Sequence, residues 1–363
     1  MAEPALAYYV TADGYGHGAR SCDILRALME AAPTLVIHIV TDLPPSFFAD
    51  RLPPGRWSQR AGRFDVGMVQ LDSVRVDVPA TLAQCRRLLA EADALEAAEV
   101  AFLRAANIRA VVADIPGIPL RAARAAGIPA LAIGNFAWDW IYEEFIPRDP
   151  AWAGVVAHFR DCYAACDLLL RLPFAEPMAA FQRRRELNVP ARPGRSRRAE
   201  LAAQSGADPG RTWILLSFTS LDWDADALAR VHALRDWEFF TVQPLGWPGP
   251  NIHAVNRRVI SYADALASCD AVLTKPGFGV LSECAVNHKP LIYVERTDFR
   301  EYPVLEAAVK RHFRHVHLPA ERLYRGDLRG ALEALAHAPE PRERLAAGGD
   351  AEAARLILDS LSR

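Results

Sequence analysis

Short apolar runs alternate with polar or amphipathic stretches along the first half of the chain. Runs of about four to eight apolar residues between turn signals are typical of buried strands, and the stretches between them have the length and periodicity of helices. The expected strands are residues 6–10, 36–40, 64–71, 110–113, 130–133 and 168–170, and the expected helices are 19–32, 80–106 and 152–166. Strands alternating with helices predict an α/β fold with a parallel, doubly wound sheet.

The same rhythm restarts after a stretch of different composition. Residues 173–211 are rich in proline and contain two arginine runs, so we interpret them as a linker. The expected domains are 1–172 and 212–363, with the last helix able to pack back on the N-terminal domain. In the second domain the expected strands are 213–217, 239–242, 259–260, 271–273 and 290–294, and the expected helices are 262–268, one ending at 287, and two starting near 327 and 351.

Composition argues against several classes of partner. The formal net charge of the 363 residues is -2, which gives no electrostatic case for nucleic acid. The six cysteines form no CxxC pair, which argues against a metal or redox motif. No secretion signal opens the chain and no apolar run approaches the roughly 20 residues that span a bilayer, so we expect a cytoplasmic protein. The arginine runs favour a solvated surface over an anionic membrane contact.

Residues 272–283 read as a strand, a tight turn and the start of a helix. Gly277 and Gly279 allow the backbone to approach a ligand, and the helix that follows offers free N–H groups and a positive dipole end to a phosphate. Lys275 adds a charge beside this turn, and the Glu283 carboxylate is able to accept hydrogen bonds from a ribose diol. The alternative is an ordinary strand–turn–helix unit of an α/β fold.

A glycine-rich segment around His17 follows the first strand. Its G-x-G-H-G pattern is not the G-x-G-x-x-G fingerprint of dinucleotide sites, so we reject a nicotinamide cofactor. The glycines, Gly16 among them, predict that His17 is presented rather than buried. Asp114 ends a neighbouring strand, and a carboxylate bonded to one imidazole nitrogen makes the other a better base. The alternatives are that each side chain only caps a helix.

Polar and aromatic side chains also follow other expected strands. Residues 134–142 combine several aromatic rings with Asn135 and Asp139, which indicates either a lid over a polyol or interdomain packing. The hydroxyl-rich turn 217–220 is suited to phosphate oxygens, and acidic groups gather in 295–301. Side chains at the carboxyl ends of parallel strands lie at the ligand crevice of such sheets.

These motifs resemble a known family. Segments 9–17, 135–142, 275–283 and 299–303 resemble the glycosyltransferase-like half of plant L-arabinokinases, and nearly the whole chain is similar to two-domain GT-B glycosyltransferases. That broader group includes the UDP-sugar transferases and the peptidoglycan N-acetylglucosaminyl transferase. The resemblance does not include the sugar-kinase half of the arabinokinases, so kinase activity is not carried over.

The resemblance implies a fold and a set of roles. Two Rossmann-like domains would face one cleft, the C-terminal one holding a nucleotide sugar and the N-terminal one an acceptor, with no cofactor and no metal site. His17 matches the family's general base and Asp114 its orienting acid. The expected donor-side residues are Ser217, Thr219, Ser220, Tyr262, Lys275, Gly277, Phe278, Gly279, Glu283, Asp298 and Glu301, and the acceptor-side residues are Gly16, Asn135, Trp138 and Asp139.

The sequence therefore predicts a metal-independent, inverting glycosyltransferase that uses a nucleoside-diphosphate sugar, with UDP-sugars favoured. Two departures leave the sugar open. Val280 stands where the family often has a small hydroxylated residue, and Asp298-Phe299 stands where plant UDP-sugar transferases have Asp-Gln. The alternatives are a non-catalytic nucleotide-sugar-binding or regulatory module, a sugar-nucleotide epimerase on the same fold, and a membrane-associated transferase.

Overall fold

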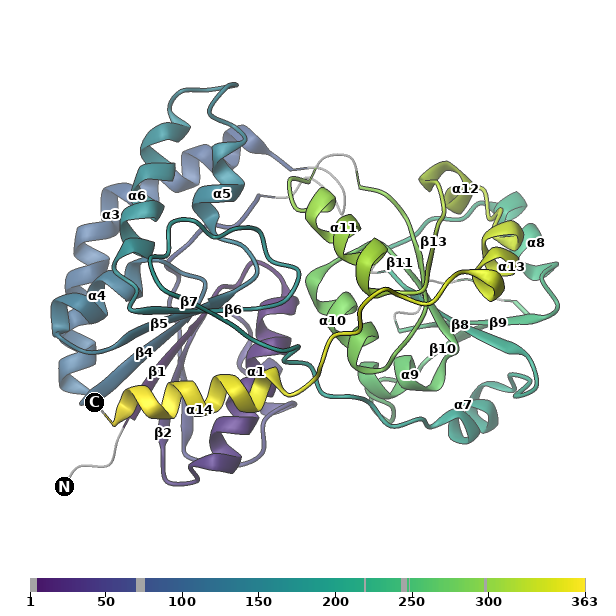
Figure 1. The fold of residues 1–363 in the computed structure, drawn as a ribbon, viewed down its shortest axis with the longest axis horizontal. Coiled ribbons are helices and arrows are strands. Elements are labelled where there is room, and N and C mark those ends of the chain that lie inside the picture. The colour runs from purple at the N-terminus through teal and green to yellow at the C-terminus, as the bar shows by residue number, and fades with distance from the viewer. Residues whose placement is uncertain are drawn as a thin grey trace. The chain divides into compact units, whose positions relative to one another are not determined.

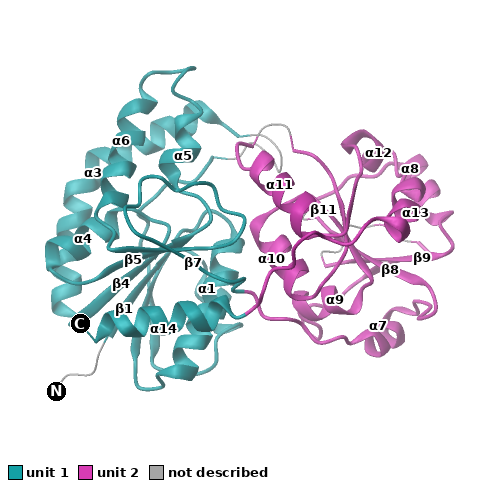
Figure 2. Ribbon diagram, viewed as in Figure 1, with its two compact units in different colours: residues 1–190, 348–363 teal, residues 191–347 magenta. Residues whose placement is uncertain are grey.

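The computed structural model describes residues 5–69, 76–218, 220–242, 247, 249–296 and 299–362. The chain forms two compact units (Figure 2). Unit 1 comprises residues 1–190 and 348–363, and unit 2 comprises residues 191–347. Each unit has its own sheet and is described separately.

Unit 1 contains a seven-stranded sheet in the order β3-β2-β1-β4-β5-β6-β7, in which every neighbouring pair is parallel. Its strands are β1 (Ala5–Val10), β2 (Val36–Val40), β3 (Trp57–Arg60), β4 (Ile108–Asp114), β5 (Ala130–Gly134), β6 (Leu168–Arg171) and β7 (Arg184–Glu186). Its helices are α1 (Tyr15–Ala31), α2 (Pro45–Ala49), α3 (Val78–Ala105), α4 (Ile118–Ala126), α5 (Trp138–Glu143), α6 (Trp152–Ala164) and α14 (Gly349–Leu361). Helices α1 and α14 cover one face of the sheet, and α3, α4 and α6 cover the other (Figure 1).

Unit 2 contains a six-stranded parallel sheet in the order β10-β9-β8-β11-β12-β13. Its strands are β8 (Thr212–Ser217), β9 (Trp237–Thr241), β10 (Ile252–Ala254), β11 (Ala271–Thr274), β12 (Leu291–Tyr293) and β13 (His315–His317). Its helices are α7 (Arg198–Ser205), α8 (Ala225–His232), α9 (Tyr262–Ser268), α10 (Phe278–Val286), α11 (Tyr302–His312), α12 (Ala320–Tyr324) and α13 (Arg329–His337). The α/β, doubly wound prediction is confirmed for both halves of the chain.

The strand order places one topological switch point in each sheet. In unit 1 the order reverses between β1 and β4, and in unit 2 it reverses between β8 and β11. Ligands of open α/β sheets bind outside the carboxyl ends of the strands at such points, because the two loops there turn to opposite faces and leave a crevice. The start of α1, which carries His17, follows β1 and Asp114 ends β4, while Ser217 ends β8 and Lys275 follows β11. The strand order alone therefore places these four residues at the edges where ligands of such sheets bind.

Two expected strands are wrong. Residues 64–69 of the expected strand 64–71 form no strand, while β3 lies earlier, at Trp57–Arg60; residues 70 and 71 lie outside the described part. Phe64 and Val66 are buried without pairing, and the Arg63 guanidinium donates to the carbonyls of Asp65 and Val66 instead. Residues 259–260 form no strand, and β10 occupies the sheet edge.

The boundary between the units also differs from the expected linker 173–211. Residues up to 190 belong to unit 1, where β7 pairs with β6, and residues from 191 belong to unit 2, where α7 lies. The arginine runs of this segment take part in ion pairs, including Arg197 with Glu200 and Arg198 with Asp270. Helix α14 returns to unit 1 and packs along α1 (Figure 1).

Candidate active site

His17 and Asp114 meet at the switch point of unit 1. The His17 Nδ1 atom lies 2.8 Å from the Asp114 Oδ1 atom, across the carboxyl ends of β1 and β4. The backbone supports this meeting, because the Thr11 N–H donates to the Asp114 carbonyl at 2.9 Å. The Asp114 side chain is fully buried. An imidazole held by a buried carboxylate is the arrangement that general-base chemistry requires.

His17 is not presented by a loop as the sequence predicted. Helix α1 begins at Tyr15, directly after Gly14 with φ of 87°, so His17 lies in the first turn of the helix. Its residue exposure is only 8%, since its ring turns inward toward Asp114. The capping alternatives are wrong as well: α1 begins after Gly14 and α4 after Gly117, and neither has a side-chain cap hydrogen bond.

Arg20, one turn after His17 on α1, completes this cluster. Its Nε donates to Asp114 Oδ2 at 2.8 Å, and its Nη2 donates to Asp114 Oδ1. Nη2 also lies 2.8 Å from His17 Nδ1, and Nη1 donates to the Asn135 side-chain oxygen. The Ser21 hydroxyl donates to Asp114 Oδ2 at 2.9 Å. The carboxylate thus has a forked arginine, an imidazole and a hydroxyl around it.

These contacts set the charges of the cluster. Burial disfavours ionisation of Asp114, but Arg20 and then His17 outweigh it and hold the pKa of this carboxyl well below its usual range. The pKa of His17 is lowered, first by burial and then by the Arg20 charge, although Asp114 opposes both. At neutral pH the site therefore contains an ionised Asp114 and a neutral imidazole, which is the form that accepts a proton.

The acceptor-side candidates divide between this cluster and the interior. Asn135 belongs to the cluster through Arg20, and its amide nitrogen donates to the Pro173 carbonyl. Gly16 is exposed beside His17, and a Cβ built on it meets no described atom within 4 Å. Trp138 is 1% exposed and donates from Nε1 to Asp65 at 2.9 Å. Asp139 is buried beside Arg160, which donates to it at 3.4 Å.

The aromatic segment 134–142 is not a lid. Most of its aromatic residues belong to the short helix α5, and Trp138 and Tyr142 stack on each other with ring centroids 5.6 Å apart. Tyr142 packs on Trp152 of α6 in turn. The packing interpretation therefore holds for Trp138 and Asp139, but the packing is within unit 1.

In unit 2 the donor-side candidates gather at the second switch point. Ser217 and Thr274 end neighbouring strands and are partners in register, and the Thr274 hydroxyl donates to the Ser217 carbonyl at 3.1 Å. The Ser217 hydroxyl lies 2.8 Å from the Tyr262 hydroxyl at the start of α9. Burial raises the pKa of Tyr262, which keeps this phenol neutral. Ser217 and Tyr262 therefore present a neutral pair of hydroxyl groups at this edge.

Helix α10 starts at the same edge, three residues after Lys275. Gly277 is its N-cap residue, with extended backbone and no side-chain cap hydrogen bond, and its first turn contains no acidic residue. Cβ atoms built on Gly277 and Gly279 meet nothing described closer than 3.9 Å. A helix start without a side-chain cap, at the positive end of the helix dipole, is suited to an anion. Phe278 and Glu283 lie on the same helix.

Two cations flank this helix start. Burial and the neighbouring Arg296 charge lower the pKa of Lys275, so the two side chains lie within electrostatic reach of each other. Arg296 stacks over the Phe299 ring with its guanidinium carbon 3.3 Å from the centroid, and its Nε atom is buried with no hydrogen-bond partner in the described structure. Glu301, at the N-cap of α11, interacts electrostatically with Arg296. Half-buried like charges within electrostatic reach of each other are costly, and an anion bound beside them would reduce that cost.

Two donor-side candidates lie outside the described residues. These are Thr219 and Asp298. Ser220 is described and is exposed. The remaining donor-side residues lie on β8, α9, the β11–α10 turn, α10 itself and the start of α11.

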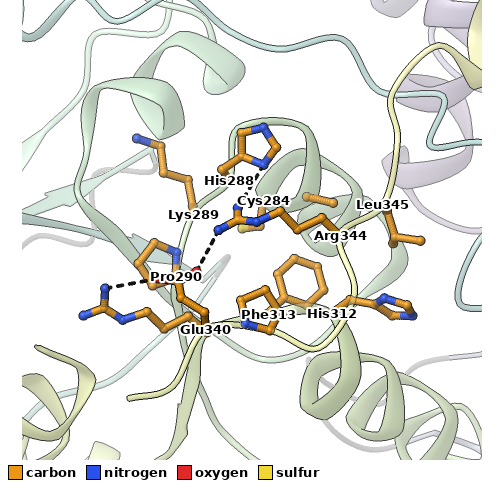
Figure 3. A pocket seen from close by; sticks show the side chains of 12 residues that line it. Cys284, His288, Lys289, Pro290, His312, Phe313, Glu340, Arg344 and Leu345 are labelled. Atoms are coloured by element: carbon orange, nitrogen blue, oxygen red, sulfur yellow. Dashed lines mark hydrogen bonds and ion pairs between the residues drawn. The ribbon is translucent and has the colours of Figure 1, made fainter. Parts of the chain in front are cut away.

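A separate pocket of about 150 Å³ lies at the other end of the unit 2 strands (Figure 3). It is bounded by His288 and Pro290 before β12, Phe313 before β13, and Glu340 and Arg344 beyond α13. The Arg344 guanidinium contacts Glu340 at 2.7 Å and His288 at 3.4 Å, and both interactions are drawn in Figure 3. Since this pocket lies before the strands, it is not the predicted donor site.

The described residues lack two kinds of feature. Within them, no group of three or more His, Cys, Asp or Glu side chains is placed to hold a metal ion. No helix among them has the length and apolarity needed to cross a membrane.

Comparisons with known proteins agree with this architecture. The calicheamicin glycosyltransferase CalG4 superposes with a TM-score of 0.62 over 99% of this chain and 95% of that one, at 18% identity. The Arabidopsis thaliana protein UGT89C1, solved with UDP-L-rhamnose, gives a TM-score of 0.58 over the whole of both chains, at 13% identity. The chain has the GT-B fold. At these identities the likeness establishes the fold alone.

Sequence comparison adds one relative. L-arabinokinase of Arabidopsis thaliana is 30% identical over 311 residues, which are 82% of this chain and 29% of that protein. The chain therefore spans less than a third of the relative's length. The predicted resemblance to L-arabinokinases and to GT-B glycosyltransferases is confirmed. No family model matches the sequence.

Sequence reasoning missed Arg20 and Arg296. Arg20 is three residues after His17, a spacing that places two side chains on the same face of a helix. The signal was present, but the helix was expected to begin only after His17. Arg296 follows β12 by three residues, in a segment whose acidic and hydroxyl groups gave the stronger signal.

Proposed function

We propose that this protein transfers a sugar from a nucleoside-diphosphate sugar, with UDP-sugars favoured, to an acceptor hydroxyl with inversion at the anomeric carbon. The observation that carries the proposal is the contact of 2.8 Å between His17 Nδ1 and the buried Asp114 carboxylate, on a GT-B fold. Anion-binding features at the start of α10 support the donor half of the proposal.

In the proposed reaction the acceptor hydroxyl loses its proton to His17 Nε2 while its oxygen forms a bond to the anomeric carbon. The bond from that carbon to the diphosphate oxygen breaks, and the electron pair leaves with the diphosphate. Asp114 keeps the imidazole oriented and faces the charge that forms on it. A positioned general base of this kind contributes about 10²- to 10⁴-fold to the rate.

Unit 2 would stabilise the leaving group. The α10 N–H groups, Lys275 and Arg296 supply positive charge where the diphosphate develops its own, and each well-placed donor of this kind contributes roughly 3–4 kcal/mol. Glu283 is proposed to bind the ribose, and Glu301 and Asp298 the donor sugar. With two cations beside the helix start, the proposal includes no metal ion and no resident cofactor.

The test is turnover by the full chain. Nucleotide sugars are incubated with and without a panel of hydroxyl acceptors, with EDTA present, and the free nucleoside diphosphate and the sugar products are quantified. We expect acceptor-dependent release of diphosphate and a product of inverted anomeric configuration. His17→Gln should reduce this turnover by at least about 10²-fold while leaving donor binding unchanged.

Other outcomes would contradict the proposal in distinguishable ways. Conversion of the donor to an isomeric nucleotide sugar without acceptor would identify an epimerase. Donor binding without transfer or hydrolysis across the panel would identify a binding or regulatory module. Turnover that persists in His17→Gln would show that the assigned base is wrong, and loss of turnover in EDTA would show that a metal takes part.

A further inference from the structure

Arg20 contacts both of the residues that the proposed function uses. The Asp114 carboxylate accepts from two nitrogens of one guanidinium, in the bidentate geometry that fixes a carboxylate plane. Because Ser21 and His17 occupy its remaining sides, this buried group has no freedom to rotate. Arg20 itself is anchored by its bond to Asn135, which belongs to the loop after β5.

Three atoms of the cluster form a compact triangle. Asp114 Oδ1, His17 Nδ1 and Arg20 Nη2 lie within 2.8 Å of one another. Nη2 donates to Oδ1, and its 2.8 Å contact with Nδ1 is a hydrogen bond only in the tautomer whose Nδ1 has a lone pair. The ionised Asp114 carboxylate can only accept, so the 2.8 Å contact between Oδ1 and Nδ1 favours a proton on Nδ1 that points at Oδ1.

This geometry has a consequence for charge. With Nδ1 protonated, Nε2 bears the lone pair and is the nitrogen that accepts a proton. Protonation of Nε2 would create an imidazolium 2.8 Å from a guanidinium that already neutralises Asp114. The carboxylate therefore orients the ring. It stabilises an imidazolium only weakly, because the Arg20 charge largely cancels its own.

We propose that Arg20 is the positioning residue of this site: its fork selects the His17 tautomer with Nε2 free, and its charge opposes protonation of the ring. The inference deepens the proposed function and rests on it only for the role of His17 as a base. The other ionisable groups that face the cluster are Tyr8 of β1 and Asp65 of the segment after β3, both of which interact electrostatically with Asp114. Tyr8 remains neutral because burial raises its pKa, whereas Asp65, with a pKa of about 6, titrates in the same range as a histidine.

The test is nuclear magnetic resonance of the imidazole nitrogens in the ¹⁵N-labelled full chain, between about pH 5 and 8.5. The chain has 10 histidines, so the His17 signals are identified by their loss in His17→Gln. The wild type should show protonated Nδ1 and unprotonated Nε2, with a midpoint below the ordinary value of about 6.5. Arg20→Met should raise that midpoint by about one pH unit or more.

Two further variants sharpen the result. Arg20→Lys keeps the charge without the fork, so the midpoint should stay low while the second tautomer becomes populated. Arg26→Met is the matched control, since Arg26 lies on the same helix but contacts Asp23 and the Arg51 carbonyl, and it should change neither quantity. Asp65→Asn separates the Asp65 titration from that of His17.

The outcomes are decisive without turnover, so failure of the transferase proposal would not obscure them. A wild-type His17 with its proton on Nε2 would overturn the inference, as would a folded Arg20→Met with an unmoved midpoint. Arg20→Met leaves a buried carboxylate without its cation and can fail to fold. In that case Arg20→Lys decides, because an unchanged tautomer there contradicts the role of the fork. Where turnover is measurable, the acid limb of its pH profile should move with the midpoint.

Discussion

The role proposed for Lys275 can be tested by comparing a ligand that has a diphosphate with one that lacks it. If it contacts a diphosphate, Lys275→Ala should weaken UDP binding by about 1.5–3 kcal/mol, or about 10- to 100-fold, and leave uridine binding unchanged. Titration calorimetry measures both. Lys310→Ala is the control, because Lys310 forms an exposed pair with Glu306 at 3.0 Å on α11. An equal loss for uridine and UDP would place Lys275 away from the phosphates.

Asp65 makes the free energy of unfolding depend on pH, in a direction that follows from its raised pKa. Burial raises the pKa of this carboxyl to about 6, above about 3.9 for the unfolded chain. Between about pH 4 and 6 the folded state holds a proton that the unfolded state has released, so the free energy of unfolding falls as pH rises through this window, by up to about 3 kcal/mol. Asp65→Asn should remove this component.

Urea unfolding at pH 4.5 and pH 8 checks that expectation. The absolute stability of Asp65→Asn reflects also the bonds that Asp65 accepts from Thr11 and Trp138, so the comparison is of the change with pH. The exposed Asp226 supplies the control variant Asp226→Asn. A pH dependence identical in Asp65→Asn and the wild type would contradict the account.

At the residue scale the sequence predicted a pairing but not its setting. That His17 and Asp114 meet followed from their places at the ends of two strands, because parallel strands share one carboxyl edge. The contact of Arg20 with Asp114 could not be predicted, because it depends on where α1 begins. The burial of Trp138 and Asp139 did not follow either, because an aromatic run has the same composition in a lid and in a core.

At the scale of elements, the start of α10 carries the donor half of the account. A Cβ on Gly279 meets nothing described within 4 Å, so Gly279→Ala should leave the fold intact or stabilise it by up to about 1 kcal/mol. It should nevertheless weaken UDP binding by about tenfold, since the methyl group occupies the space in front of the helix. Thermal melts and calorimetry measure the two effects.

Gly154 provides the matched control for that variant. It lies in the first turn of α6 in unit 1, and a Cβ there also meets no described atom within 4 Å. Gly154→Ala should share any gain in stability and leave UDP binding unchanged. If Gly279→Ala binds UDP as tightly as the wild type, the diphosphate does not approach this turn.

Apolar pattern predicted most strands and helices, and its failures have a common cause. The pattern reports burial, and burial does not require a strand: Phe64 and Val66 are buried in a segment whose carbonyls are bonded by Arg63. Conversely, β7 was missed because Arg184–Glu186 is exposed and charged, as edge strands often are. The predicted start of α1 is late because glycines in a sequence indicate a loop.

At the scale of the molecule, a described core cluster in each unit predicts two separable responses to damage. Ile357 of α14 is fully buried in the unit 1 core, and Leu332 of α13 is buried in the unit 2 core. Ile357→Ala and Leu332→Ala should each destabilise their own unit by about 2–5 kcal/mol. Hydrogen exchange, followed peptide by peptide, should show loss of protection confined to the unit that carries the change. Equal loss in both units for both variants would show a single cooperative core.

The division of the chain could not be predicted from composition alone. Proline and arginine between 173 and 211 indicated a linker, yet these residues complete a sheet edge in unit 1 and a helix in unit 2. Composition does not show which strand a segment pairs with. Segment β7 is a strand because it pairs with the edge of β6. Helix α14 similarly belongs to unit 1 through the apolar face it shares with α1.

The most direct test of the central claim is a crystal structure of the full chain with a UDP-sugar. The account predicts the diphosphate against the N–H groups that begin α10, within reach of Lys275 and Arg296, with the ribose at Glu283. An empty helix start in a crystal whose ligand lies elsewhere, or a helix start filled by side chains of the protein, would contradict it.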